Sequence, residues 1–285
     1  MLKQRIITAI WLIPLVLGAI FYLPPFYFSW VLVPVFAIAA REWGRIIDPS
    51  CQVTKWSFTA TIAAVLIALN FIVPADNIWL RGHIHPVMLA LLFLGAFWWL
   101  VALLLVVFFP NSSRWWQGNH MLKSMFGQLT LLPCFAGFTT IKALDSEANP
   151  YMGGTLLLLV LLVVWAADSG AYFAGKRFGK TKLIARVSPG KTVEGLFGGL
   201  LTTLIVVAGV MYFSPEQEWK LVTAVTLITA LASALGDLSE SMFKRVAKIK
   251  DSGTILPGHG GVLDRIDSLT AALPVFALLY LAFWM

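Results

Sequence analysis

Residues 86–109 read PVMLALLFLGAFWWLVALLLVVFF, a run without a single charged side chain. At a rise of about 1.5 Å per residue, a helix of this length reaches about 36 Å, which exceeds the roughly 30 Å hydrocarbon core of a bilayer. Similar runs occur at 6–23 and 151–167. These runs predict an all-α, polytopic integral membrane protein, because a β-barrel would show weak alternation in pieces of about ten residues.

The composition agrees with this fold class. Of the 285 residues, 59% are hydrophobic and 12% are charged, whereas soluble domains have about 45–50% apolar and about 25% charged residues. The two cysteines, Cys51 and Cys134, are too few for a disulfide framework or a zinc site. The first apolar run has no small-residue cleavage site, so we expect no cleaved signal peptide.

We expect about nine transmembrane helices, eight to nine in number. The Pro24–Pro25 turn leaves open a re-entrant pair in place of the first two spans. The nine expected spans are 6–23, 26–40, 56–73, 86–109, 124–143, 151–170, 193–213, 219–238 and 269–285.

The basic residues predict the orientation of these spans. The net charge of +7 does not indicate nucleic-acid binding here, because the positive charges collect in loops on one side of the expected bundle. With a cytosolic N-terminus, 18 of the 21 Lys and Arg residues fall on the cytosolic side, and only Arg81, Lys142 and Lys220 do not. The positive-inside rule therefore predicts a cytosolic N-terminus.

The chain divides into two halves of different character. Residues 1–150 are interpreted as a transmembrane scaffold, and residues 151–285 as a catalytic region with polar cytosolic loops. In the second half, acidic residues end or begin apolar runs, where charge is costly and marks function by default. The alternative for each acid is a simple ion pair with a nearby base. These acids are Asp168, Asp237, Glu240, Asp264 and Asp267.

Their spacing places several of them together. Asp237, Glu240, Ser241 and Lys244 recur at i, i+3, i+4 and i+7, so they share one helix face. Asp264 and Asp267 are three apart, which aligns them on a helix. Hard oxygen ligands of this kind suit Mg²⁺, which takes one or two carboxylates together with substrate phosphates and water.

A basic loop, GKRFGKTKLIARVSPGKT at 175–192, is the complementary feature. It is either a phosphate-binding loop, in which glycines let backbone N–H groups approach an anion, or a loop that sets topology and attracts anionic lipids. The tetrapeptide PGKT is not part of a P-loop, since that motif requires glycine where this chain has Ala185. The later GHGG at 258–261 predicts a tight backbone close to a ligand.

A longer pattern resembles a known family. The segment from Ser241 to Asp267, SMFKRVAKIKDSGTILPGHGGVLDRID, resembles the signature of the phosphatidate cytidylyltransferases, S-x-apolar-K-R-x4-K-D followed by P-x-H-G-G-apolar-x-D-R-apolar-D. Every fixed position of that signature is present. SPGKTVEG at 188–195 and DSGAYFAGKRFGK at 168–180 are similar to further landmarks of the family. Together they cover roughly the last 120 residues.

The resemblance implies a bacterial inner-membrane enzyme that joins CTP and phosphatidic acid, yielding CDP-diacylglycerol and pyrophosphate. It also implies dependence on Mg²⁺, a second cation such as K⁺, and a homodimer among membrane lipids. In such a transfer the lipid phosphate attacks the α-phosphorus of CTP, so two anions must meet and cations supply most of the catalysis.

The candidate site residues are mainly acidic and basic residues of the second half. Asp237 and Asp264 are the first choices as metal ligands, with Asp267 and Asp168 for a second cation or in support. Arg265 braces a carboxylate or clamps a phosphate. His259 is assigned either to a phosphate contact or to a structural role. The candidates for phosphate binding or the pocket lining are Lys176, Arg177, Lys180, Lys191, Ser241, Lys244, Arg245, Gly260 and Gly261.

Two other functions fit parts of the pattern. A transporter also uses acidic residues within the membrane, but its halves are expected to repeat. A CDP-alcohol phosphatidyltransferase has D-G-x2-A-R, whereas Asp168-Ser169-Gly170 lacks the adjacent glycine and the downstream pattern.

Overall fold

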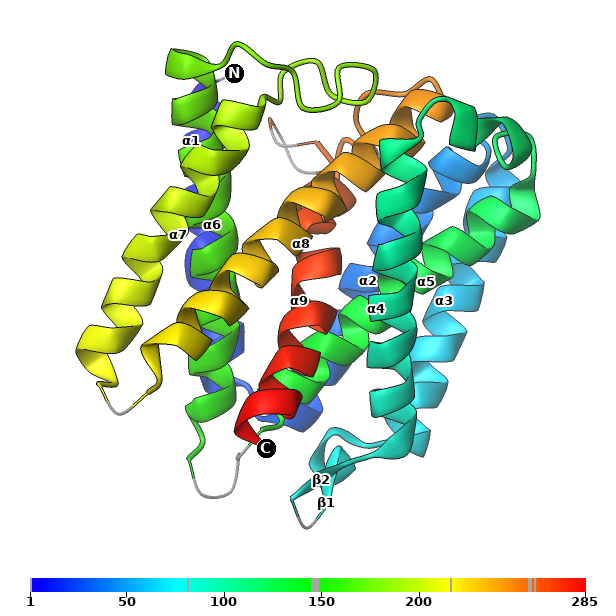
Figure 1. The fold of residues 1–285 in the computed structure, drawn as a ribbon. Helices are drawn as coiled ribbons and strands as arrows, with labels where there is room; N and C mark the ends of the chain where they lie inside the picture. Colours follow the sequence, from blue (N-terminus) through cyan, green and yellow to red (C-terminus); the bar gives the residue numbers. More distant parts are fainter. Residues whose placement is uncertain (1, 81, 145–148, 216, 256–257, 259) are drawn as a thin grey trace.

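The structure is a computed structural model that describes residues 1–285 except 1, 81, 145–148, 216, 256–257 and 259, and except the side chains of 2–9. Its described part contains nine α-helices, which run alternately up and down (Figure 1). They are α1 (Leu2–Tyr22), α2 (Pro25–Ile47), α3 (Gln52–Ile72), α4 (Pro86–Val107), α5 (His120–Lys142), α6 (Met152–Phe178), α7 (Val193–Phe213), α8 (Trp219–Val246) and α9 (Leu263–Trp284).

The prediction of an all-α polytopic fold is confirmed. Each expected span overlaps one helix, and seven of the helices, α3 to α9, are long and apolar enough to cross a bilayer. The apolar described part of α1 is only Ile10–Tyr22, and α2 ends in charged residues that include Arg41 and Arg45. Other elements in the described ranges are the short strands β1 (Trp79–Leu80) and β2 (His83–Ile84), and the 3-10 turns η1 (Ala75–Asn77) and η2 (Asn111–Trp115).

The two ends of the bundle differ. The N-terminus, the loop after α6 and the loop after α8 lie at the upper end in Figure 1, whereas the C-terminus and the β1–β2 hairpin lie at the lower end. We call the upper end the loop face. The loop face receives the C-termini of α6 and α8 and the N-termini of α7 and α9, so the motif residues of the second half meet there.

Helices of the first half support α8 and α9 from one side. Trp43 of α2, Trp98 of α4 and Phe126 of α5 pack around Phe243 of α8, with ring centroids 5.1, 6.5 and 5.8 Å from it. The indole nitrogen of Trp99 donates to the carbonyl of Thr270 in α9 at 3.2 Å. Offset and edge-to-face aromatic pairs each add about 0.5–1.5 kcal/mol beyond their burial, so this cluster fixes the position of α8.

Glycines bring α6 and α7 into close contact next to Asp168. A Cβ on Gly170 would overlap Oγ1 of Thr202, and a Cβ on Gly198 would overlap Ala174. The Thr202 hydroxyl donates to the carbonyl of Ala166 at 2.7 Å, which ties the two helices together. Small residues at such crossings let backbones approach closely in a membrane.

Candidate active site

The acidic face of α8 is the base of the site. Ser241 Oγ donates to Asp237 Oδ1 at 3.4 Å, one turn away, and Lys244 Nζ lies 3.1 Å from Glu240 Oε1. The predicted alignment of these four side chains on one helix face is therefore confirmed. Asp237 is half-buried and Glu240 is buried, so this helix face runs from a solvent-accessible end into the protein interior.

Lys191 comes to this face from the loop between α6 and α7. The loop folds back on itself, because Leu183 N donates to the Lys191 carbonyl at 3.1 Å and Val193 N donates to the Thr181 carbonyl at 2.9 Å. Glu194 holds the turn by accepting from the backbone N–H groups of Lys180 and Thr181, each at 3.1 Å. Lys191 Nζ then lies 2.6 Å from Asp237 Oδ2.

Asp264, in the first turn of α9, is held on several sides. Its Oδ1 accepts from Lys244 Nζ at 2.7 Å, and its Oδ2 accepts from Gly261 N at 2.8 Å. The Ser252 N–H donates to both oxygens, at 3.1 and 3.0 Å. The carboxylate is only 7% exposed. Most of the hydrogen-bond acceptor sites of Asp264 are therefore occupied by donors of the protein.

A second group of acids lies around Asp237. Asp168 of α6 interacts electrostatically with Asp237, Lys191 and Arg265. Asp267 of α9 interacts electrostatically with Asp237, Lys191 and Lys244. Three helices thus each bring one aspartate to the same region, together with cationic side chains from the loop and from α9.

This donor set fits a metal–substrate complex better than a metal cage built by protein alone. Within the described residues, no group of three or more His, Cys, Asp or Glu side chains is close enough to hold a metal ion. Mg²⁺ usually takes only one or two carboxylates and completes its shell with phosphates and water. Asp237 with Asp168 or Asp267 supplies that number, and Asp264 is the most fully bonded of the four predicted ligands.

The other predicted cations are placed differently. Lys176 lies 5.9 Å from the ring of Tyr172, and Arg177 lies 5.7 Å from the ring of Phe178. Neither they nor Lys180 form an ion pair with any acid in the described ranges. All three are exposed at the loop face, and their assignment to phosphate stays a prediction. Arg245 turns toward the loop and donates from Nε to the Val187 carbonyl at 3.3 Å.

Two glycines before α9 have a positive φ. Gly260 has a φ of +84°, in the region that favours glycine, and Gly258 has a φ of +76°. The Gly261 N–H is donated to Asp264, inside the protein. His259 lies outside the described residues. The contact of Gly260 and Gly261 with a substrate stays a prediction.

Sequence reasoning did not find two residues of α2 that contact the segment between α8 and α9 and the start of α9. Glu42 accepts hydrogen bonds from the N–H groups of Val262 and Leu263, at 3.1 and 2.7 Å. Arg45 Nη1 donates to the Ser252 carbonyl at 2.6 Å. The one available signal was an acid, Glu42, among the basic residues that end an apolar span.

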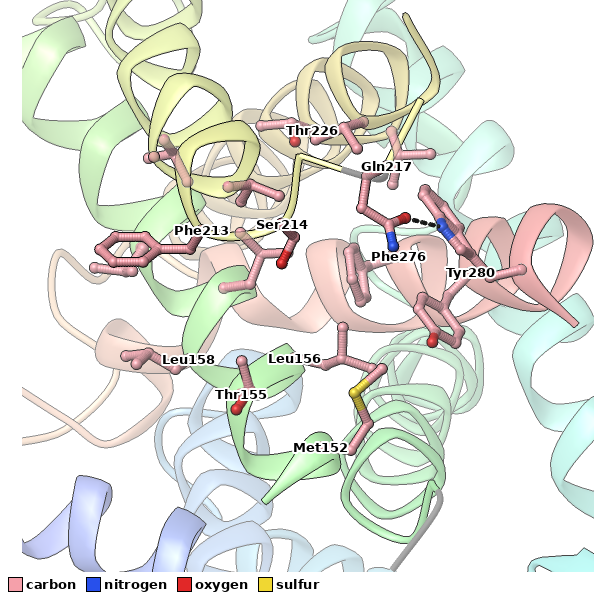
Figure 2. A pocket seen from close by; sticks show the side chains of 18 residues that line it. Met152, Thr155, Leu156, Leu158, Phe213, Ser214, Gln217, Thr226, Phe276 and Tyr280 are labelled. Carbon is pink, nitrogen blue, oxygen red and sulfur yellow. Dashed lines mark hydrogen bonds between the residues drawn. The ribbon is translucent and has the colours of Figure 1, made fainter. Parts of the chain in front are cut away.

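A large cavity lies away from these charges. About 480 Å³ in volume, it is lined by side chains from α6, α7, α8 and α9, such as Leu156, Val210 and Phe276 (Figure 2). Gln217 Oε1 accepts from Trp284 Nε1 at 2.7 Å at its edge. The lining residues belong to the lower ends of these helices, and their apolar side chains suit hydrocarbon, not a nucleotide.

Comparison with known proteins identifies the family of the chain. The model of the cytidylyltransferase family matches residues 3–283. A phosphatidate cytidylyltransferase of Haemophilus influenzae is 42% identical over 98% of this chain and 99% of its own length. One of Pseudomonas aeruginosa is 42% identical over 100% and 99%. One of Staphylococcus aureus is 50% identical over 50% of this chain and 54% of its own. This chain therefore belongs to the cytidylyltransferase family.

Proposed function

We propose that the protein transfers CMP from CTP to phosphatidic acid, giving CDP-diacylglycerol and pyrophosphate for phospholipid synthesis. Family membership over almost the whole chain removes the transporter and the CDP-alcohol phosphatidyltransferase as alternatives. The observation that best supports the reaction is the 2.6 Å contact between Lys191 Nζ and Asp237 Oδ2, with Asp168 and Asp267 both close enough to interact electrostatically with this pair.

The main obstacle to this reaction is that both substrates are anions. A phosphate monoester is already a competent nucleophile, so the protein must bring two anions together and stabilise the charge that develops on the pyrophosphate. In this proposal Lys191 and Arg265 neutralise phosphate oxygens. When bound by Asp237 with Asp168 or Asp267, Mg²⁺ would supply further positive charge to the triphosphate, and a second cation such as K⁺ belongs to the same proposal.

Asp264 and Lys244 have a supporting part in this proposal. Lys244 pairs with both Glu240 and Asp264 inside the protein, so the buried face of α8 can lie against the first turn of α9. Ser241 orients Asp237 from one turn away. These contacts hold Asp237 and Asp267 at a fixed separation before substrates arrive, which lowers the ordering cost of catalysis.

The proposed setting is the bacterial inner membrane. The loop face contains most of the basic residues of the chain, which favours a cytosolic position for it and gives access to CTP. The lipid tails stay in the bilayer while the head group reaches the acids. The homodimer implied by the family resemblance belongs to the same proposal.

The test is direct. The purified protein is incubated in detergent with phosphatidic acid, labelled CTP and Mg²⁺, beside Asp237→Asn and the exposed control Glu218→Gln. We expect labelled CDP-lipid from the wild type and from the control, and a loss of at least 100-fold in Asp237→Asn. A well-folded wild type that makes no CDP-lipid under varied lipid and cation conditions would refute the reaction. Full activity in Asp237→Asn would remove Asp237 from the chemistry.

A further inference from the structure

Ser252, in the loop between α8 and α9, is bonded by three charged residues. It is fully buried. Its N–H donates to Asp264, its carbonyl accepts from Arg45 at 2.6 Å, and its hydroxyl donates to Glu42 Oε2 at 3.4 Å. Two of these partners come from α2, in the half of the chain interpreted as scaffold. The loop that leads into the site is therefore held from outside the motif.

Glu42 is the centre of this arrangement. It is 3% exposed and, within the described ranges, forms no ion pair. Its two oxygens accept from Val262 N and Leu263 N, at the start of α9. The first N–H groups of a helix lack partners within the helix, and the helix dipole favours a negative charge there. A buried carboxylate is thus stabilised by the helix that it caps.

The loop leaves no room beside this carboxylate. A Cβ on Gly253 would overlap Glu42 Oε1, and a Cβ on Gly261 would lie 2.5 Å from both carboxylate oxygens. A side chain at either position would therefore push the Glu42 carboxylate away from its present contacts. This explains two of the glycines in the motif loop by a protein contact, before any ligand is considered.

The same contacts decide which groups remain for phosphate. Three successive N–H groups, those of Gly261, Val262 and Leu263, are donated to carboxylates of the protein. The start of α9 therefore offers none of these donors to an anion, although helix N-termini often bind phosphate. Phosphate binding is left to the cationic side chains at the loop face. What Glu42 fixes is the direction of α9, which contains Asp264, Arg265 and Asp267.

We propose that Glu42, assisted by Arg45, is a positioning residue for the transfer reaction. It sets the backbone at Ser252, Gly253 and Gly261–Leu263 and the first turn of α9, and thereby the separation of the α9 acids from Asp237. This inference rests on the proposed function for its kinetic consequences, but its structural consequences can be measured without it.

The first experiment compares Glu42→Gln with Glu218→Gln, an exposed glutamate that precedes α8 at the opposite end. The amide keeps the shape of the side chain but turns a donor toward a backbone N–H. We expect kcat to fall at least tenfold and the Mg²⁺ concentration for half-maximal activity to rise several-fold, with no change in Glu218→Gln. A purely structural role would lower the active fraction and leave the Mg²⁺ dependence and the KM for CTP unchanged, and that result would overturn the proposal.

The half-buried Arg45 gives a milder variant if Glu42→Gln does not fold. Arg45→Gln removes one hydrogen bond to the same loop, and we expect the same shift in Mg²⁺ dependence with a smaller loss of kcat. Two results would overturn the positioning role. In the first, both variants have wild-type kinetics. In the second, Glu42→Gln misfolds and Arg45→Gln has wild-type kinetics.

A double-mutant cycle tests the contact itself, using hydrogen exchange of the ligand-free protein. When Glu42 is present, Gly253→Ala should accelerate hydrogen exchange at the Ser252, Val262 and Leu263 amides. In a Glu42→Ala background, which leaves space for the new methyl group, it should change exchange little. Additive effects would overturn the packing on which the proposal depends. Because this measurement needs no turnover, it separates failure of the positioning role from failure of the proposed reaction.

Discussion

Lys191, one residue before the N-cap of α7, lies 2.6 Å from Asp237 on α8, and each side chain is about one-third exposed or less, at 27% and 31%. The pair joins the basic loop to the acidic helix face. Because both groups still reach solvent, substrate phosphates and cations can compete for each of them. The contact therefore marks the place where the loop and the acids would share a ligand.

Lys191→Met should lower activity with little effect on stability. Partly exposed ion pairs contribute about 0–1 kcal/mol, so the melting temperature should stay within a few degrees of the wild type. Loss of one phosphate-facing cation should raise the KM for CTP at least tenfold. Steady-state kinetics and thermal melting in detergent measure both effects. Lys220→Met, at the far end of the molecule, is the control, and an unchanged KM in Lys191→Met would contradict the assignment.

Lys244→Met, unlike Lys191→Met, should strongly lower the stability of the protein. The Lys244, Glu240 and Asp264 side chains are only 11%, 4% and 7% exposed. Removing one partner of a buried pair leaves an uncompensated charge and costs about 3–5 kcal/mol. Thermal melting beside Lys191→Met gives a matched comparison of two lysine–aspartate pairs. Equal melting temperatures for the two variants would show that burial does not distinguish them.

Two glycine-to-alanine changes in the α6–α7 pair should change the stability of the protein in opposite directions. Gly170→Ala places a methyl group against Thr202 and should destabilise by about 1–3 kcal/mol. At Gly209 of α7, a Cβ would meet nothing within 4 Å, and alanine should stabilise the helix by up to about 1 kcal/mol. Thermal melting of both variants checks the signs. Destabilisation by Gly209→Ala would show that the space is filled in the membrane.

The orientation can be read from cysteine labelling. In a Cys51→Ser background, the remaining Cys134 is buried. Gly190→Cys lies at the loop face and Asp76→Cys at the opposite end, and both positions are exposed. A membrane-impermeant maleimide should label Gly190→Cys only in inside-out vesicles and Asp76→Cys only in right-side-out vesicles. The reverse pattern would place the loop face outside the cell.

The helices were predictable because apolar runs long enough to span a bilayer have few alternatives. Hydropathy alone did not give their polar ends. The expected span 219–238 stops at the acids, whereas α8 continues to Val246, and α9 begins at Leu263, six residues before the expected 269. Hydropathy marks where a segment leaves the hydrocarbon, but hydrogen bonding and capping decide where a helix ends. The motif residues therefore lie on helices that extend beyond the apolar runs.

The candidate site was predictable in part for a related reason. Helical periodicity placed Asp237 and Lys244 on one face, since that relationship is local. The contact of Glu42 with Val262 joins residues 220 positions apart, and no periodicity links them. The metal ligands and the division into two halves stay predictions. Glu42 and Arg45 nevertheless place two contacts from the first half at the motif loop.

The capping of α9 by Glu42 has a consequence for biogenesis. At about 5–20 residues per second, the ribosome makes Val262 roughly 10–45 s after Glu42. Throughout that interval α2 contains an acid without its hydrogen-bond donors at the edge of the membrane. The carboxylate must stay hydrated or bind elsewhere until the last span is inserted. A nascent chain that stops before α9 thus presents an unsatisfied acidic group, which distinguishes an unfinished enzyme from a finished one.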